Sequence, residues 1–142
     1  AGRRYDFGLE AGSKPELVVA LAHRLAKDAL IVCNGVKDAE FVRLAILSRK
    51  LGFNTVIVLE SPKEAETVIE VARQEGCRKI WAIVTNDNLD AQRFFQRRGF
   101  VLSHVRIGSM SKIRLLKPNV PRVGYYDLPV RDEFEYALEL TP

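Results

Sequence analysis

Residues 29–53 read ALIVCNGVKDAEFVRLAILSRKLGF, an apolar run followed by a polar turn and a helical pattern. The run ALIVCN is short, continuous and rich in β-branched residues, which is typical of a strand covered on both faces. Apolar residues then recur at spacings of three and four from Phe41 to Leu51, and Gly52 follows as a left-handed stop. The stretch therefore predicts one strand and one helix that packs on it.

The same unit recurs on both sides of this stretch. Two helix starts carry the pattern of a capping box, Ser13 with Glu16 and Ser61 with Glu64. Further strand-like runs are YDFGLE, TVIVLE and IWAIVT, at residues 5–10, 55–60 and 80–85. Strands that alternate with helices predict an α/β fold with an open, mixed, mostly parallel sheet of about five or six strands and helices on both faces.

The pattern changes after Phe100. VLSHVRI alternates as a half-buried strand, SMSKIRLLKP is a short helix or turn, and the proline-containing PNVPRVGYYDLPVRD is an irregular connection. EFEYALEL alternates again, so we expect it to close the sheet as an antiparallel strand.

The composition predicts one folded, soluble domain. The chain has 142 residues, 47% of them hydrophobic and 28% charged, with a net charge of +4. No apolar run reaches the roughly 18 residues of a membrane helix, so we expect no membrane partner and a cytoplasmic location. Basic residues cluster late in the chain but lack interleaved exposed aromatics, so we expect no nucleic-acid partner; they are Arg93, Arg97, Arg98, Arg106, Lys112, Arg114 and Lys117.

No residue pattern predicts catalysis or metal binding. Cys33 and Cys77 lack the spacing of a metal site and are expected to be reduced thiols. His23 and His104 have no partner at a diagnostic spacing, which leaves a triad or a zinc site without support. Lys14 is expected to be an exposed lysine of a first helical turn.

The strand ends suit an anion. In open parallel sheets ligands bind outside the carboxyl ends of strands, where helix N-termini offer free N–H groups. Gly12, Ser13, Gly35 and Lys37 are therefore candidates for a phosphate or carboxylate site, although Lys37 is expected to be exposed. The alternative, which we favour, is that Ser13, Ser61 and Asn88 only cap helices.

The first half resembles a known enzyme family. FGLEAGSKPEL, ALIVCNGVKDAEFVRLAILSRKLGF and TVIVLESPKEAETVIEVA, within residues 4–73, resemble part of the pyridoxal-phosphate (β/α)8 barrel of biosynthetic arginine decarboxylases. The resemblance implies about three consecutive βα units, whereas a whole barrel takes about 250 residues. No residue matches the cofactor lysine, the phosphate loops or the catalytic residues of the family. Pyridoxal phosphate is therefore not expected.

The second half, about residues 77–140, resembles the C-terminal part of a Gcn5-related N-acetyltransferase. The resemblance rests on RKIWAIVTNDNLDAQRFFQRRGF and PVRDEFEYALEL. It implies that Asn88 matches the residue that contacts the coenzyme, and that Phe95 stands where a tyrosine often serves as general acid. A phenyl ring cannot donate a proton. The glycine-rich loop that holds the pyrophosphate in this family does not precede Ile80, so acetyl-CoA should bind weakly if it binds.

These two resemblances predict a chimera joined near residues 73–78. We expect a single domain in which residues 1–75 come from the barrel and residues 76–142 from the acetyltransferase. The leading interpretation is a recombined or designed protein with no evolved activity and no cofactor. The alternatives are a divergent N-acetyltransferase that uses acetyl-CoA, and a small anion-binding module. Open strand edges also allow self-association as a homodimer.

Overall fold

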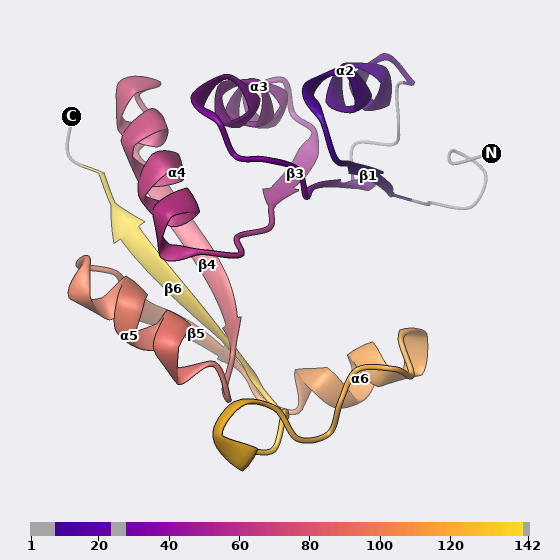
Figure 1. Cartoon of the computed structure of the whole chain (residues 1–142), viewed down its shortest axis with the longest axis vertical. Helices are drawn as coiled ribbons and strands as arrows, with labels where there is room; N and C mark the ends of the chain where they lie inside the picture. Colours follow the sequence, from indigo (N-terminus) through magenta and orange to yellow (C-terminus); the bar gives the residue numbers. More distant parts are fainter. Residues whose placement is uncertain (1–7, 24–27, 141–142) are drawn as a thin grey trace. The chain divides into compact units, whose positions relative to one another are not determined.

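The computed structural model describes residues 8–23 and 28–140 (Figure 1). The chain divides between Cys77 and Arg78 into two compact units, and each is described by itself. Among the described residues, no helix combines the length and apolar character that crossing a membrane requires.

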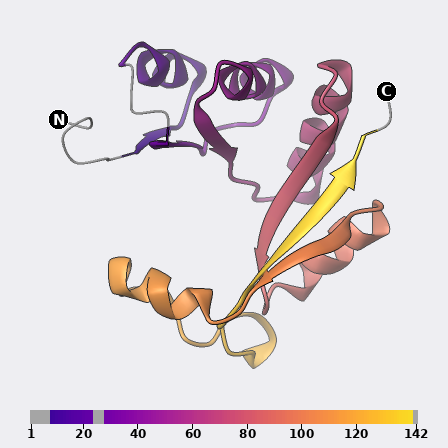
Figure 2. The ribbon, with the colours of Figure 1, turned by 180° about the vertical axis from the view of Figure 1, so that it is seen from behind.

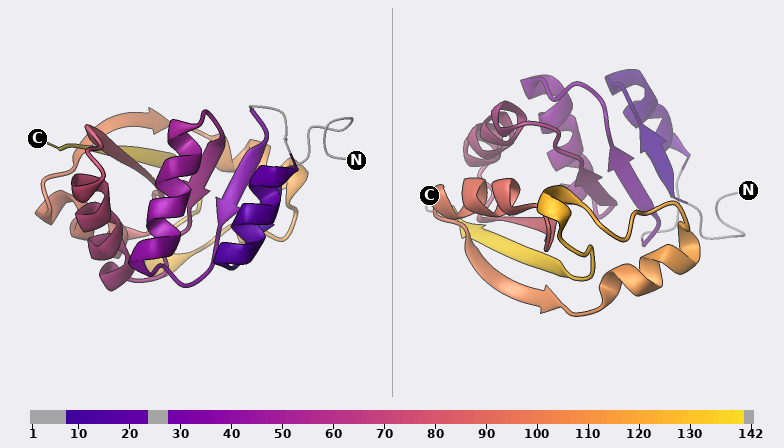
Figure 3. Two further views of the ribbon diagram at one scale, coloured as in Figure 1. Left: turned by 90° about the horizontal axis from the view of Figure 1, so that it is seen from above. Right: turned by 60° about the horizontal axis from the view of Figure 1, so that its bottom comes forward.

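The first unit is a parallel sheet with three helices that follow its strands. Its elements are β1 (Leu9–Ala11), α2 (Lys14–Ala22), β2 (Leu30–Cys33), α3 (Ala39–Lys50), β3 (Asn54–Ile57) and α4 (Pro62–Gln74). The sheet order is β1-β2-β3 and both pairs are parallel, with Ile31 opposite Leu9 and Thr55. Figure 3 shows α2 and α3 lying side by side over these strands.

The helices of this unit begin where the sequence predicts. The side chain of Ser13 accepts a hydrogen bond from the backbone N–H of Glu16, and Ser61 does the same for Glu64. Asp38 caps α3 by accepting from the N–H of Phe41. Each cap satisfies a donor that the helix itself leaves without a partner.

The core of the first unit lies between the sheet and the helices α2 and α3. Its buried residues come from both layers and are Ala11, Leu17, Ala20, Ile31, Cys33, Phe41 and Ala45. Ser48 is also fully buried, and its hydroxyl oxygen lies 2.6 Å from Thr55 Oγ1 and 2.7 Å from the Ala45 carbonyl oxygen, both within hydrogen-bonding distance. Burial of this polar pair is tolerated because each hydroxyl has a partner.

The second unit is an antiparallel sheet whose last strand in sequence lies in the middle. Its elements are β4 (Lys79–Thr85), α5 (Leu89–Arg97), β5 (Val101–Arg106), α6 (Ser109–Leu116), the short turn η1 (Tyr125–Asp127) and β6 (Glu133–Glu139). The sheet order is β4-β6-β5, which Figure 2 shows from behind. A register shift between Leu102 and His104 marks a bulge in β5.

One face of this sheet packs on α5. Tyr136 of β6 is buried, and its hydroxyl lies within hydrogen-bonding distance of Gln92 and Gln96 of α5. Phe95 and Phe100 are buried on the same helix and in the turn that follows it. Gly99 ends α5 with a φ of 85°, as the sequence predicts.

The α/β class, the parallel strands and the antiparallel C-terminal strand are confirmed. The detail differs from the expectation of one mixed sheet, because the described strands form two separate three-stranded sheets. Strand order depends on contacts between residues far apart in sequence, and the local patterns that identify a strand do not contain it.

Candidate functional site

Asn88 lies in the turn between β4 and α5, where it caps the helix. Its Oδ1 accepts from the N–H of Ala91 at 3.1 Å, and its own N–H donates to the Thr85 carbonyl at 3.1 Å. Within the described part of the chain its Nδ2 group has no hydrogen-bond partner. The capping role is therefore observed, and the amide N–H₂ is the part of the side chain that remains for a ligand.

Phe95 lies two turns into α5 and is only 8% exposed. Its ring packs edge-on against Phe94, with centroids 5.3 Å apart, and against Phe100, with centroids 4.9 Å apart. Such edge-to-face pairs stabilise a core. The position that the resemblance associates with a general acid is thus part of an aromatic cluster.

Two phenols lie near α5, and neither is a strong acid. The Tyr126 hydroxyl donates to Asp90 Oδ2 at 2.6 Å, and this hydrogen bond raises the tyrosine pKa because the anion would face a carboxylate. Burial raises the pKa of Tyr136. A phenol with a raised pKa gives up its proton less readily than an ordinary tyrosine.

The N-terminus of α4 is occupied by the chain's own carboxylate. Glu64 Oε2 accepts from the N–H of Glu60 at 2.8 Å, while Ser61 Oγ accepts from the N–H of Glu64 at 3.3 Å. The two side chains satisfy donors that a phosphate would otherwise use. A negatively charged ligand would also meet the charge of Glu64 here.

The four predicted anion ligands lie near the carboxyl ends of β1 and β2. Gly12 and Gly35 are brought together, since a Cβ atom built on Gly35 would lie 2.2 Å from the Gly12 carbonyl oxygen. The N–H of Gly12 already donates to Glu16 Oε2 at 2.6 Å, and Ser13 caps the same helix. The N–H of Gly12 and the hydroxyl oxygen of Ser13 are thus both used at the start of α2.

Lys37 is buried, contrary to our expectation of an exposed lysine. Its side chain is 1% exposed, and Nζ lies 3.6 Å from Glu64 Oε1. The expectation was wrong because Lys37 precedes the Asp38 cap and so lies before the first turn of α3. A buried ammonium is tolerated in proteins when a carboxylate faces it.

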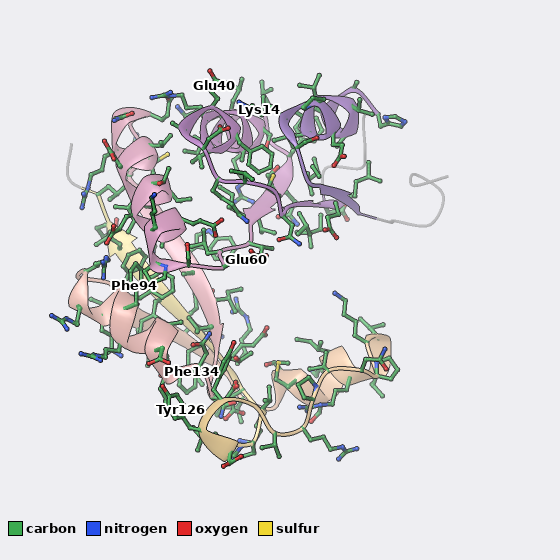
Figure 4. The ribbon with its side chains drawn as sticks, in the orientation of Figure 1. Lys14, Glu40, Glu60, Phe94, Tyr126 and Phe134 are labelled. Carbon is green, nitrogen blue, oxygen red and sulfur yellow. The ribbon has the colours of Figure 1, made fainter. Side chains whose placement is uncertain are left out.

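Lys14 lies on the surface, as expected, and is held by two carboxylates. Its Nζ lies 2.6 Å from Glu40 Oε2 and 3.2 Å from Asp38 Oδ2 (Figure 4). The hydrogen bond to Glu40, with a further one to Asp38, raises the lysine pKa. The amine is therefore fully protonated at neutral pH and unsuited to Schiff-base chemistry.

The two cysteines are free and differ in burial. Cys33 is fully buried, and burial raises the pKa of its thiol to about 11. Cys77 is partly exposed. Across residues 8–23 and 28–140, no three His, Cys, Asp or Glu side chains are grouped as a metal site requires.

Beside Asn88, the side chains of Asn86 and Asp87 form hydrogen bonds that no sequence pattern predicts. The side chain of Asn86 donates to the Pro129 carbonyl at 2.8 Å and accepts from the N–H groups of Arg131 and Asp132 at 2.8 and 2.9 Å. Buried Asp87 accepts from the N–H of Tyr125 at 3.0 Å. The turn that would carry a coenzyme contact therefore holds the connection between α6 and β6.

Part of the predicted basic cluster has the same structural role. Arg114 donates to the carbonyl oxygens of Val120, Pro121 and Val130, two of them at 2.6 Å. Arg106 pairs with Glu135 on the neighbouring strand at 2.7 Å. The contacts of Arg114 with Val130 and of Arg106 with Glu135 join segments that are distant in the chain, so no short sequence signal reveals them.

A shallow space of about 400 Å³ lies at the amino end of β3, lined by Asp28, Arg49, Gly52, Phe53 and Asn54. The Arg49 guanidinium donates to Asn54 Oδ1 at 3.2 Å. None of the predicted site residues lines it.

Two different groups of proteins are similar to parts of this chain. The family model described as acetyltransferase (GNAT) family matches residues 65–100, from within α4 through β4 and α5. That match begins upstream of the predicted joint at residues 73–78. Among solved structures, the IAA acetyltransferase from Bacillus cereus is 20% identical with a TM-score of 0.47, covering 55% of this chain and 49% of that one.

The other group consists of arginine decarboxylases. Arginine decarboxylase 1 of Oryza sativa subsp. japonica is 51% identical over 82 residues, which cover 56% of this chain and 12% of that protein. The biosynthetic arginine decarboxylase of Thermosynechococcus vestitus is 49% identical over 79 residues, with the same two coverages. The crystal structure of the Campylobacter jejuni enzyme is 37% identical with a TM-score of 0.49, covering 51% of this chain and 12% of that one.

The chain thus spans about an eighth of the length of the decarboxylases that it matches. One part of it is similar to arginine decarboxylases and one part to the GNAT acetyltransferases, and both similarities cover fragments.

Proposed function

We propose that this chain is a recombined protein in which fragments of two enzymes form one folded chain without the chemistry of either parent. The similarity of fragments of this chain to two enzyme families supports this origin. Helix α4 can serve in both fragments, because a helix follows a strand in each of them.

The observation that carries the proposal is the role of Asn88. Its Oδ1 is engaged by the N–H of Ala91, and the ring of Phe95 is enclosed by two other aromatic rings. Both residues are explained by helix capping and core packing. At the N-terminus of α4, Glu64 occupies the place where an anionic ligand would receive hydrogen bonds.

The test is a calorimetric titration with acetyl-CoA and with free CoA, combined with two substitutions at Asn88. Asn88→Ala removes the cap and should lower the free energy of unfolding by about 1 kcal/mol. Asn88→Asp is the matched control, because aspartate caps as well as asparagine but has no amide donor for the coenzyme. We expect no saturable heat for either ligand, with Asn88→Asp as stable as the parent chain.

The second candidate is acetyl-CoA-dependent N-acetylation, which the GNAT match over residues 65–100 favours. The free Nδ2 group of Asn88 would then contact the coenzyme. A one-to-one isotherm in the micromolar range that Asn88→Asp abolishes would refute the leading proposal in favour of this one.

The anion-binding module has less support, because the N–H of Gly12 already donates to Glu16 and the Ser13 side chain already caps α2. Pyridoxal phosphate is not proposed, since the resemblance to the decarboxylases implies that the strand with the cofactor lysine lies outside the matched fragment. An ordered phosphate bound to the amides near Gly35, in a crystal grown with phosphate, would support the anion-binding hypothesis.

A further inference from the structure

β4 has one edge that pairs with no other described strand. β4 pairs with β6 on one side and with no other described strand, so it is an edge strand of seven residues. We propose that two copies of this chain associate through this edge, with the two β4 strands antiparallel and the two sheets continuous.

The orientation of the backbone groups follows from the pairing with β6. The N–H of Leu140 donates to the Arg78 carbonyl, and the N–H of Asn86 donates to the Asp132 carbonyl. In an antiparallel pair such bonds recur at every second residue, so even-numbered residues of β4 face β6. The N–H and C=O groups of Lys79, Trp81 and Ile83 therefore point to the open edge.

A second copy fits this edge in one register. An antiparallel pair centred on Ala82 overlaps the whole strand and places Trp81 opposite Ile83 of the partner copy, where outward-pointing groups meet. Lys79 then lies opposite Thr85, so no like charges face each other. Trp81 and Ile83 are 41% and 44% exposed, and they would form a cross-strand aromatic and β-branched pair on each side of the central Ala82.

The other described edges are protected in ways that β4 is not. β5 has a bulge and carries His104 and Arg106. β1 has three residues, one of them Glu10, and β3 has four. Short strands, bulges and charges are the means by which proteins block edge pairing, whereas β4 carries a charge only at its first residue.

The test begins with the mass of the full chain in solution. Multi-angle light scattering from about 1 to about 100 µM should show the mass rising to that of a dimer. Trp81→Lys with Ile83→Lys places two lysines opposite each other, and Trp81→Glu with Ile83→Glu does the same with glutamates. Each double variant alone should be monomeric, and an equimolar mixture should form a heterodimer, because position 81 lies opposite position 83.

The matched control places lysines on the other edge of the sheet, as Val101→Lys with Val105→Lys, and it should dimerise like the unsubstituted chain.

A second measurement needs no substitution. Amide hydrogen exchange should become slower with concentration at Trp81 and Ile83, while Ala82, which faces β6, stays protected throughout.

Several outcomes would overturn the proposal. The unsubstituted chain could stay monomeric over the whole concentration range. The lysine variant at positions 81 and 83 could still dimerise. The two oppositely charged variants could be folded and yet fail to combine. Concentration-dependent protection that falls on β5 instead of Trp81 and Ile83 would place the contact elsewhere and would also refute it.

Discussion

The ion pair of Lys37 and Glu64 should respond asymmetrically to removal of its two partners. Two unit charges 3.6 Å apart attract by about 5 kcal/mol at an effective dielectric constant of about 20. Desolvation of the buried ammonium offsets much of this attraction. Glu64→Gln keeps an acceptor for the N–H of Glu60 but leaves the Lys37 charge buried without a counter-charge. We expect it to lower the free energy of unfolding by about 2–3 kcal/mol.

Lys37→Met removes the buried charge and keeps the volume, so we expect a change within about 1 kcal/mol. The double variant should lie near Lys37→Met, which gives a coupling energy of about 2 kcal/mol. Urea unfolding followed by far-UV circular dichroism measures these values. Fluorescence of Trp81, the chain's single tryptophan, reports the second unit separately. A Glu64→Gln chain as stable as the parent, beside a Lys37→Met chain destabilised by more than about 2 kcal/mol, would refute this reasoning.

Two further predictions concern the first unit. Since the pKa of Cys33 is raised to about 11, the native state keeps a proton that the unfolded state releases above about pH 8.5. The free energy of unfolding should therefore fall by about 2–3 kcal/mol between pH 8.5 and 11, and Cys33→Ala should remove this slope in urea titrations. Gly35→Ala should lower the free energy of unfolding by more than about 2 kcal/mol, because the added Cβ would lie 2.2 Å from the Gly12 carbonyl oxygen. Thermal unfolding measures this change. An unchanged melting temperature for Gly35→Ala would contradict that contact.

Local signals in the sequence identified most of the helices and strands. The capping boxes at Ser13 and Ser61 are present as predicted, and Gly52, Gly76 and Gly99 have positive φ values at helix ends. These features succeed because a cap or a stop involves residues within about four positions of each other, so the sequence contains the whole interaction.

Features that depend on distant residues were not predictable in this way. The buried charge of Lys37 faces Glu64, which belongs to the next βα unit. The role of Asn86 depends on a segment more than 40 residues away. The division into two sheets has the same origin, since β4 pairs with β6 instead of with β3. The prediction that Asn88 caps a helix is confirmed. Its Oδ1 accepts the capping hydrogen bond, so only its Nδ2 group remains for other contacts.

The central position of β6 has a consequence for synthesis of the chain. The ribosome makes β4 and β5 before β6, yet neither has its hydrogen-bonding partner until residues 133–139 emerge. The described strands of the first unit pair only with one another, so this sheet can form earlier in translation, since domains generally fold in N-terminal order. The second unit therefore still has two unpaired strands after the strands of the first unit have been made. Chaperone dependence should accordingly be concentrated in the interval between synthesis of Thr85 and synthesis of Glu139.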